Sequence, residues 1–454
     1  MTTTNLTPAS IEELEVGRDK MTQAELDDVL SLHDKFLKHR AGGVRASLKL
    51  RDLSYLDLSG RNLSEADLSG AKLFGCSLRG AKLHNANLFA ADLRTANLEH
   101  TEFKRADLRG ACLRGARMND ALFIEADLRG GVMLKPGKDG ELKQLTVSGG
   151  GSEMGSASAQ RANMTGAKIS NAFILQTDLT DAVLCNVRFI RADLSYSNLT
   201  GATLEGADLT EANLSGANLQ GAVLSRTCMA YTNLRDADLI GAIMDSVDLS
   251  MADLTNATMV KQLDALDASL REIIGGHVQW IATGGREGRR ADLSKHDLTK
   301  EDLGGLNLSA CNLAYSILKG VNLAKISLVM ADLSFTDLRE ADLSNGDMRG
   351  INLSRATLTG ARLTGARMGP VEVSGSNVSH WTANLENARL IRCVMTGADL
   401  RAARLSRADL SNADLRDVDL RRAVLVDANV TGADLRGAKL DGADLRGAIG
   451  YVPE

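Results

Sequence analysis

Large apolar residues recur at every fifth position through most of this chain. The first run begins at Leu48, Leu53 and Leu58 and continues, with Phe or Met at some positions, to Met133. A small residue, most often Ala, stands two positions before most of these central residues. On a straight helix a five-residue step rotates the side chain by about 140°, and on a straight strand an odd step reverses the face. The pattern therefore predicts a chain that turns after every pentapeptide and winds into a solenoid.

The polar positions around each central residue fit the same interpretation. We expect the central side chain and the small residue to fill the axis of the solenoid, because only inward positions need apolar side chains. An Asp or Asn usually precedes the central residue, and it should point outward and bond the local backbone. The Gly that often follows should accept the backbone angles of a corner. Central residues fall within 48–133, 164–259, 293–378 and 385–445.

The units at 66–70 (ADLSG), 106–110 (ADLRG) and 443–447 (ADLRG) resemble those of the pentapeptide-repeat family. The resemblance implies an all-β solenoid, a right-handed quadrilateral β-helix with four pentapeptides per coil, here with short α-helical caps. On such a coil Phe103 and Phe123, which lie twenty residues apart, should stack directly. Solenoids of this kind serve different roles, so the resemblance indicates the fold much more narrowly than the function.

Two segments with helical apolar spacing precede the two halves of the repeat pattern. The first begins with a capping box, Thr22 to Glu25, and ends at Gly42 and Gly43. His33 aligns with a second histidine, His277, which suggests an internal duplication. We expect these helical caps to cover the apolar ends of the solenoids, with the histidines packed or hydrogen-bonded there. The expected organisation is a helical cap at 1–45, a first solenoid at 46–259, a second helical cap at 260–290 and a second solenoid at 291–454.

An insertion interrupts the first solenoid at 134–161, where the positions of the central residues shift by one. Asp139-Gly140 is a hairpin-turn signal between short apolar stretches, and a Gly- and Ser-rich tract follows it. The segment is either a tolerated disordered insertion or a loop that engages a partner. A smaller irregularity follows Val378, where residues 379–381 (SHW) should bulge from a corner.

Composition and motifs indicate no enzyme. The seven histidines show no metal-binding or catalytic spacing, and we expect no cofactor, no metal and no catalytic residue. Cys76, Cys311 and Cys393 occupy the small inward position and should serve as core filler. The N-terminus has no signal-peptide pattern and no apolar run is long enough for a membrane span, which predicts a cytoplasmic protein. The net charge of −5 does not favour direct binding to DNA.

Charge is uneven along the chain. Residues 44–133 carry 14 basic and 11 acidic residues, whereas residues 162–259 carry 5 basic and 11 acidic ones. Family members that confer quinolone resistance mimic duplex DNA and bind gyrase, and the resemblance implies that such mimicry would use the acidic segment. The candidate residues for one acidic edge are Asp178, Asp193, Asp238 and Asp253. Elsewhere Arg follows Asp by two residues, as at Arg416 and Arg436, which predicts a self-neutralised, salt-bridged face.

An apolar row at twenty-residue intervals points to a different surface. It comprises Val183, Thr203, Val223 and Ile243, all at the outward position. On a four-sided coil these residues should form a stripe suited to contact with a protein. The leading hypothesis is therefore a non-enzymatic scaffold that binds a protein partner along its outer faces. The alternatives are a DNA-mimicking binder of gyrase and, more weakly supported, an enzyme that uses the two aligned histidines.

Overall fold

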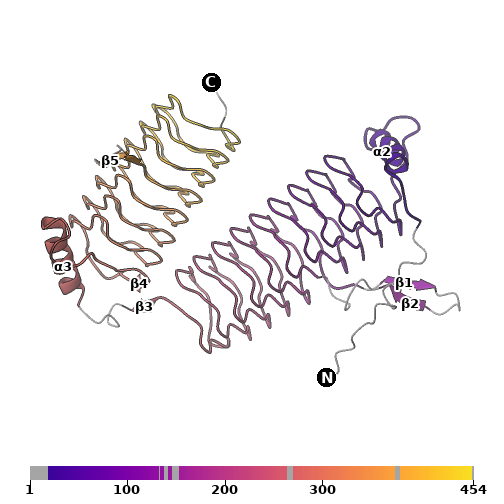
Figure 1. Ribbon diagram of the computed structural model, residues 1–454, viewed down its shortest axis with the longest axis horizontal. Coiled ribbons are helices and arrows are strands. Elements are labelled where there is room, and N and C mark those ends of the chain that lie inside the picture. Colours follow the sequence, from indigo (N-terminus) through magenta and orange to yellow (C-terminus); the bar gives the residue numbers. More distant parts are fainter. Residues whose placement is uncertain are drawn as a thin grey trace. The chain divides into compact units, whose positions relative to one another are not determined.

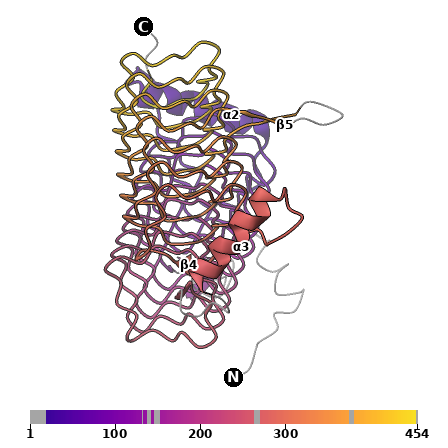
Figure 2. The ribbon, with the colours of Figure 1, turned by 90° about the vertical axis from the view of Figure 1, so that its left-hand side faces the viewer.

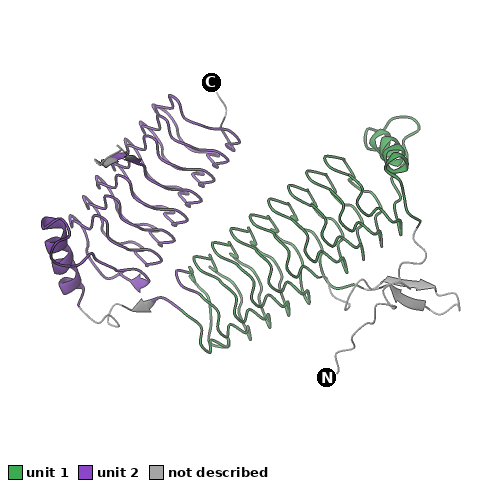
Figure 3. Cartoon of the chain, in the orientation of Figure 1, with its two compact units in different colours: residues 1–238, 242–258 green, residues 239–241, 259–454 purple. Residues whose placement is uncertain are grey.

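The computed structural model describes residues 19–131, 133–136, 142–145, 153–262, 269–373 and 379–451. The chain divides into two compact units, each of which contains a stack of coils (Figures 1 and 3). Unit 1 comprises residues 1–238 and 242–258, and unit 2 comprises residues 239–241 and 259–454.

Each coil consists of four pentapeptides, and successive coils lie in register. Parallel backbone bridges join residues twenty apart, such as Asp67 with Asn87 in unit 1 and Asp332 with Asn352 in unit 2. Most central residues also donate their N–H to the next coil, as Leu68 does to the carbonyl of Asn87 at 2.7 Å. Chain turns alternate with these bridges at every pentapeptide. The predicted right-handed quadrilateral β-helix is therefore confirmed.

The axis of each unit is filled by the central side chains. They are almost completely buried along the coils, and Phe103 stacks on Phe123 with 4.7 Å between ring centroids, as predicted. Some small inward positions carry Thr, Ser or Cys instead of Ala. Thr101 then donates from Oγ1 to the carbonyl of Leu78 in the preceding coil at 2.7 Å. A polar inward side chain is thus tolerated because the coil beneath offers a carbonyl acceptor.

The corners adopt left-handed backbone angles. Gly70 has a φ of 62°, as expected for a corner glycine, but Glu65 and Arg105 take the same conformation with φ of 65° and 55°. A non-glycine residue pays about 1–2 kcal/mol in this region. The bridges on both sides of a corner fix its backbone, so the fold holds this strain where the sequence provides no glycine.

Within the described residues each unit has one helical cap, and the two helical caps repeat one another. Helix α2 spans Gln23–Leu37 and helix α3 spans Leu270–Ala282. The predicted capping box of α2 is present, and α3 has its own, formed by Ser269 and Glu272. The chain then returns close beneath each helix, at Gly43 and at Gly288, where a Cβ would lie 2.4 Å and 2.2 Å from backbone atoms of the helix.

The insertion in unit 1 is shorter than the sequence predicted. Strands β1 (Met133–Pro136) and β2 (Leu142–Leu145) pair as an antiparallel hairpin (Figure 1). The coils resume at Glu153, which bridges Cys112, so Met133 is not a central residue and Met154 is one. Centres at the Met154 and Ala159 positions were missed because Glu153 and Ser158 replace the usual Asp or Asn. Asp139 and Gly140 lie outside the described residues.

Unit 2 contains a second hairpin that the sequence analysis did not predict. Strands β5 (Val371–Val373) and β6 (Ser379–Trp381) pair antiparallel, so the expected simple bulge at 379–381 is a β-strand instead (Figure 2). The coils continue from Met368 directly to Leu385, because Asn352 bridges Asn384. Val373 is therefore a hairpin residue rather than a central residue. The remaining pair, β3 (Lys261–Gln262) and β4 (His296–Asp297), is parallel.

Candidate interaction surface

The apolar row of unit 1 forms a continuous ladder on one outer face. Val183, Thr203, Val223 and Ile243 are joined by successive parallel bridges. Val183, Thr203 and Val223 are each half-buried between two fully buried inward neighbours, so their side chains point outward along one face. Ile243 is buried, with 5% of its surface exposed, so its predicted place in an exposed stripe is wrong. Asn163 bridges Val183 and continues the ladder towards the N-terminal coils. The stacking expected from the twenty-residue spacing is present, and use of the row as a contact surface stays a prediction.

The acidic residues do not form the single edge that the sequence suggested. Asp178 and Asp238 belong to one ladder, in which Asn198 and Asn218 separate them. Asp193 and Asp253 belong to the ladder of a neighbouring face, again with two asparagines between them. The sequence placed them together because all four lie in the acidic segment. Their positions within the twenty-residue coil separate them into two pairs.

These carboxylates accept hydrogen bonds from the same coil and from neighbouring coils. Asp178 accepts hydrogen bonds from Gln160 and Thr180, at 2.6 Å each. Burial acts to raise the pKa of Asp178, but these hydrogen bonds outweigh it and the pKa is lowered. Asp238 similarly accepts from Gln220 at 2.6 Å, and Asp253 lies 3.5 Å from Arg235. The acidic ladders therefore carry charge, but amides, hydroxyls and one guanidinium already bind these carboxylates.

The Arg-Asp pairs of unit 2 are self-neutralised, as predicted. Arg416 binds Asp414 through Nε and Nη2 at 2.9 and 2.7 Å, and Arg436 binds Asp434 in the same way. Arg416 also lies 3.8 Å from Asp434 in the next coil. The hydrogen bond from Arg416 lowers the pKa of Asp414 to about 2. Such pairs fix the side chains at the surface and leave little net field.

The two aligned histidines of the helical caps are structural. His33 is fully buried, and its Nδ1 accepts a hydrogen bond from the backbone N–H of Ala46 at 3.1 Å. His277 accepts from Ala291 in the same way at 3.0 Å. Each imidazole also stacks on an aromatic residue three positions later, Phe36 or Trp280. Because Nδ1 is the acceptor, the neutral ring carries its proton on Nε2. The predicted packing and hydrogen-bonding role of both histidines is confirmed.

The buried cysteines also behave as predicted. Cys76, Cys311 and Cys393 are buried and unoxidised at the small inward position. Cys76 donates from Sγ to the carbonyl of Leu53 at 2.7 Å. Burial raises the pKa of each of the three thiols to about 12. These thiols are therefore protonated and unreactive at neutral pH.

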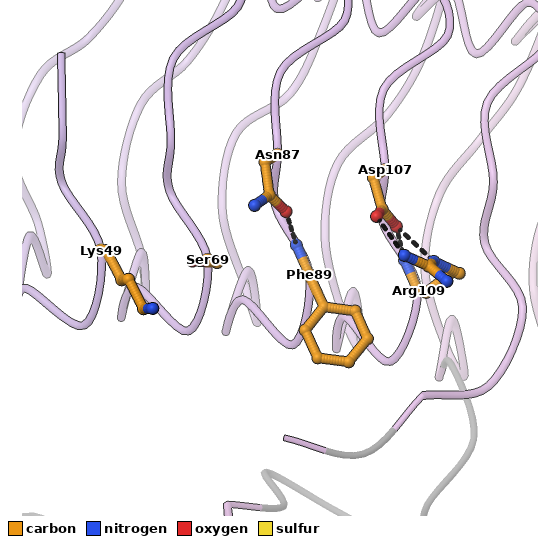
Figure 4. Close-up of a pocket in the computed structure, with 6 residues that line it drawn as sticks. All are labelled: Lys49, Ser69, Asn87, Phe89, Asp107 and Arg109. Atoms are coloured by element: carbon orange, nitrogen blue, oxygen red, sulfur yellow. Dashed lines mark hydrogen bonds and ion pairs between the residues drawn. The ribbon is translucent and has the colours of Figure 1, made fainter. Parts of the chain in front are cut away.

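Sequence reasoning missed two shallow hollows on the outer faces of unit 1. In one, Arg109 lies over the ring of Phe89, 5.4 Å from its centroid, while Asp107 holds the guanidinium (Figure 4). In the other, Arg94 lies over Phe74 at 5.5 Å. A signal was present in the sequence, because each Arg follows an outward Phe by one full coil. Both guanidiniums are already paired with Asp, while Lys49 lines the first hollow and Lys20 and Lys72 line the second.

The described part of the chain contains no cluster of His, Cys, Asp or Glu arranged to hold a metal ion. Neither of its helices has the length and apolar composition needed to cross a bilayer.

Comparisons with known structures return other repeat solenoids. HetL, a pentapeptide repeat protein involved in heterocyst differentiation regulation in the cyanobacterium Nostoc sp. strain PCC 7120, is 23% identical. That alignment covers 74% of this chain and 89% of HetL, with a TM-score of 0.16. Full-length QnrB1, a plasmid-mediated fluoroquinolone resistance protein, is 17% identical over 46% of this chain and 92% of its own, with a TM-score of 0.22.

A pentapeptide repeat protein of the Arabidopsis thaliana thylakoid lumen is 22% identical over 33% of this chain and 65% of its own, with a TM-score of 0.12. No curated protein matches the chain.

The family comparison covers more than half of the chain. The family described as Pentapeptide repeats (8 copies) matches in overlapping segments within 52–131, 162–226, 229–259, 307–369 and 383–449. These segments coincide with the bridged coils of both units. The chain belongs to the pentapeptide-repeat family.

Proposed function

We propose that this protein is a non-enzymatic scaffold whose outer faces bind a protein partner. The observation that carries the proposal is the half-exposed part of the apolar ladder of unit 1, Val183, Thr203 and Val223. The ladder on one side carries Asp and Asn at the same level, and the ladder on the other side carries Lys168, Arg188, Asp208 and Cys228, so this face differs in chemistry from those beside it. A row of β-branched residues held at the ~4.8 Å spacing of bridged strands is a rigid apolar surface, which binds at low entropic cost.

The ladder can be tested with a double substitution, Val183→Glu with Val223→Glu, in the full chain. A matched control, Asn198→Glu with Asn218→Glu, adds the same charge on a neighbouring ladder. Affinity capture from source-cell lysate, with quantification of each captured protein, should identify a partner that the valine variant loses at least tenfold and the control retains. Equal capture of every protein by both variants would mean that the apolar ladder does not bind the partner.

The hairpin insertion of unit 1 can be tested in the same assay. Deletion of residues 132–152 joins Gly131 to Glu153, and Glu153 keeps its bridge to Cys112 because that bridge runs between coils. If the hairpin engages the partner, capture should decrease in the deletion variant while the thermal unfolding temperature is unchanged. Unchanged capture would favour the tolerated-insertion interpretation.

A second candidate function is binding of gyrase by partial DNA mimicry. It is favoured by the acidic residues at Asp178, Asp193, Asp238 and Asp253 and by the similarity to a fluoroquinolone resistance protein. We rank it second because the four carboxylates are divided between two faces. We also propose that the protein is cytoplasmic. The boundaries between helical caps and solenoids are proposed to lie near residues 45, 259 and 290.

A further inference from the structure

The hairpin of unit 2 places a tryptophan at the surface. Trp381 ends strand β6, and 55% of its surface remains exposed. Val371 is its partner across the hairpin and is half-buried, while Met330 on an adjacent coil is 38% exposed. We call Met330, Val371 and Trp381 the tryptophan patch. Isolated exposed apolar residues are common, but a Trp grouped with a Met is the composition of interface hot spots.

The corner beneath the patch is shaped to receive the indole ring. Gly350 occupies this corner with a φ of 66° and is buried. A Cβ at this position would lie 2.9 Å from Cδ1 of Trp381 and 3.4 Å from Cγ of Met330. Many other corners of the chain carry residues with side chains, so glycine is not required for the turn alone. At this corner glycine lets Trp381 lie directly against the coil, which fixes an exposed aromatic side chain in place.

Positive charge borders the patch. Arg349, the residue before Gly350, binds Asp347 through Nε and Nη2, at 2.9 Å each. Arg367 in the next coil binds the same carboxylate, with Nη2 2.9 Å from Oδ2. Burial acts to raise the pKa of Asp347, but the hydrogen bond from Arg349 and the charges of both arginines lower it. Two guanidiniums thus bind one ionised carboxylate, so the cluster keeps one excess positive charge beside the exposed Trp381.

We propose that the tryptophan patch and the Arg349–Asp347–Arg367 cluster form a docking site for an acidic protein segment with an apolar anchor residue. The inference deepens the scaffold function proposed above and rests on it. The anchor would pack on Trp381 and Met330, and an acidic side chain would bind the guanidinium that Asp347 does not neutralise. A nucleic acid fits less well, because Arg401 and Arg421, the next arginines beside this ladder, are already bound to Asp399 and Asp419 and extend no positive surface along which phosphates could lie.

A random peptide library displayed on phage tests this chemistry directly. Selection uses the full chain, with counter-selection on Trp381→Ala. The enriched peptides should combine Asp or Glu with one aromatic or large aliphatic residue. For the best peptide, fluorescence anisotropy should show binding about 10- to 30-fold weaker to Trp381→Ala, the size of a hot-spot loss. Tyr196→Ala, which removes another exposed aromatic residue, is the matched control and should leave affinity unchanged.

Charge is tested by a second matched pair. Arg349→Gln and Arg446→Gln each remove an arginine that binds the Asp two residues before it in the same geometry. Arg349→Gln should weaken the peptide severalfold and reduce its salt dependence, whereas Arg446→Gln should not. Enrichment of basic or uncharged peptides, or equal affinity for Trp381→Ala, would overturn the inference. Binding of a 20-base-pair DNA duplex that is lost in Arg349→Gln would replace it with a nucleic-acid site.

The scaffold proposal can survive failure of this inference. A partner identified through the apolar ladder should then bind Trp381→Ala normally and lose affinity for Val183→Glu with Val223→Glu. If neither set of substitutions affects any captured protein, both proposals fail.

Discussion

At the scale of single residues, inward and outward positions are held by different forces. Leu214 is completely buried at the axis of unit 1. The preceding Asn213 faces outward, where it donates to Asp193 at 3.0 Å and accepts from Asn233 at 2.9 Å. The amide row is thus a ladder of hydrogen bonds rather than a set of free side chains. Packing therefore holds Leu214 in place, whereas hydrogen bonds to the neighbouring coils hold Asn213.

Leu214→Ala should lower the free energy of unfolding by roughly 2–5 kcal/mol, because rigid neighbouring coils cannot collapse into the cavity. Asn213→Ala should cost only about 0.5–1.5 kcal/mol for the altered hydrogen bonds. Urea unfolding of both variants at neutral pH measures the difference. Equal losses would mean that the inward and outward positions are not energetically distinct.

Gly42 and Gly43 in the first helical cap make a matched pair. Gly42 has a φ of 74° and open space around it, whereas a Cβ on Gly43 would lie 2.4 Å from the backbone nitrogen of Phe36. Gly42→Ala should cost at most about 1 kcal/mol, because strain is partly offset by lower entropy of the unfolded chain. Gly43→Ala should cost at least about 2–3 kcal/mol, because backbone must move. Thermal unfolding distinguishes them, and a reversed order would contradict the close return of the chain beneath α2.

At the scale of elements, a buried imidazole is one of the contacts that join each helical cap to its coil. Burial is the chief cause that lowers the pKa of His33 and His277 below 6.5. Nε2 of each ring is buried without a hydrogen-bond partner. Protonation of Nδ1 would also remove the acceptor of the Ala46 or Ala291 N–H. The attachment of both helices is therefore sensitive to acid.

Acid should destabilise the folded chain, because folding lowers the pKa of both histidines. Since the folded pKa lies below the unfolded one, the unfolded chain binds more protons below about pH 6.5, and stability falls as pH decreases through that range. The loss is at most about 1.4 kcal/mol per pH unit for each histidine. His33→Asn with His277→Asn keeps an acceptor but does not titrate, so unfolding between pH 7 and 5 should depend less on pH. An unchanged slope would assign the effect to other groups.

The sequence predicted the coils well because every unit repeats the same requirement. It predicted hairpin β1–β2 from a turn signal, but placed its end too late because Glu153 and Ser158 lack the usual Asp or Asn. It missed β5–β6 because Val373 happens to continue the five-residue spacing. The tryptophan patch was missed for a related reason. Its members Met330, Val371 and Trp381 lie far apart in the sequence and meet only through coil stacking and hairpin pairing.

At the scale of the whole molecule, charge argues against extensive mimicry of DNA. Duplex DNA carries one charge per roughly 1.7 Å of its axis. The solenoid of unit 1 has 14 basic and 11 acidic residues in 44–133, against 5 and 11 in 162–259. Several of the acidic ones are paired, as Glu211 is with Arg191 at 2.9 Å. The negative field is therefore interrupted along the solenoid.

We expect that the purified protein does not inhibit supercoiling by bacterial gyrase at sub-micromolar concentration. A gel assay of relaxed plasmid with gyrase and ATP measures this. Inhibition that disappears in Asp178→Lys with Asp238→Lys, but persists in Val183→Glu with Val223→Glu, would reverse our order and make gyrase binding the primary function. Local field rather than net charge would then guide the docking.

The way the coils resume after each hairpin has an evolutionary consequence. Leu128 and Met154, and likewise Met368 and Leu385, are central residues that follow one another in space although a hairpin separates them in the chain. Closing a longer detour costs only about 0.6 kcal/mol for each doubling of its length. New binding segments can therefore evolve by insertion at these two corners while the coils stay unchanged. For the same reason, foreign peptides can be inserted there by design.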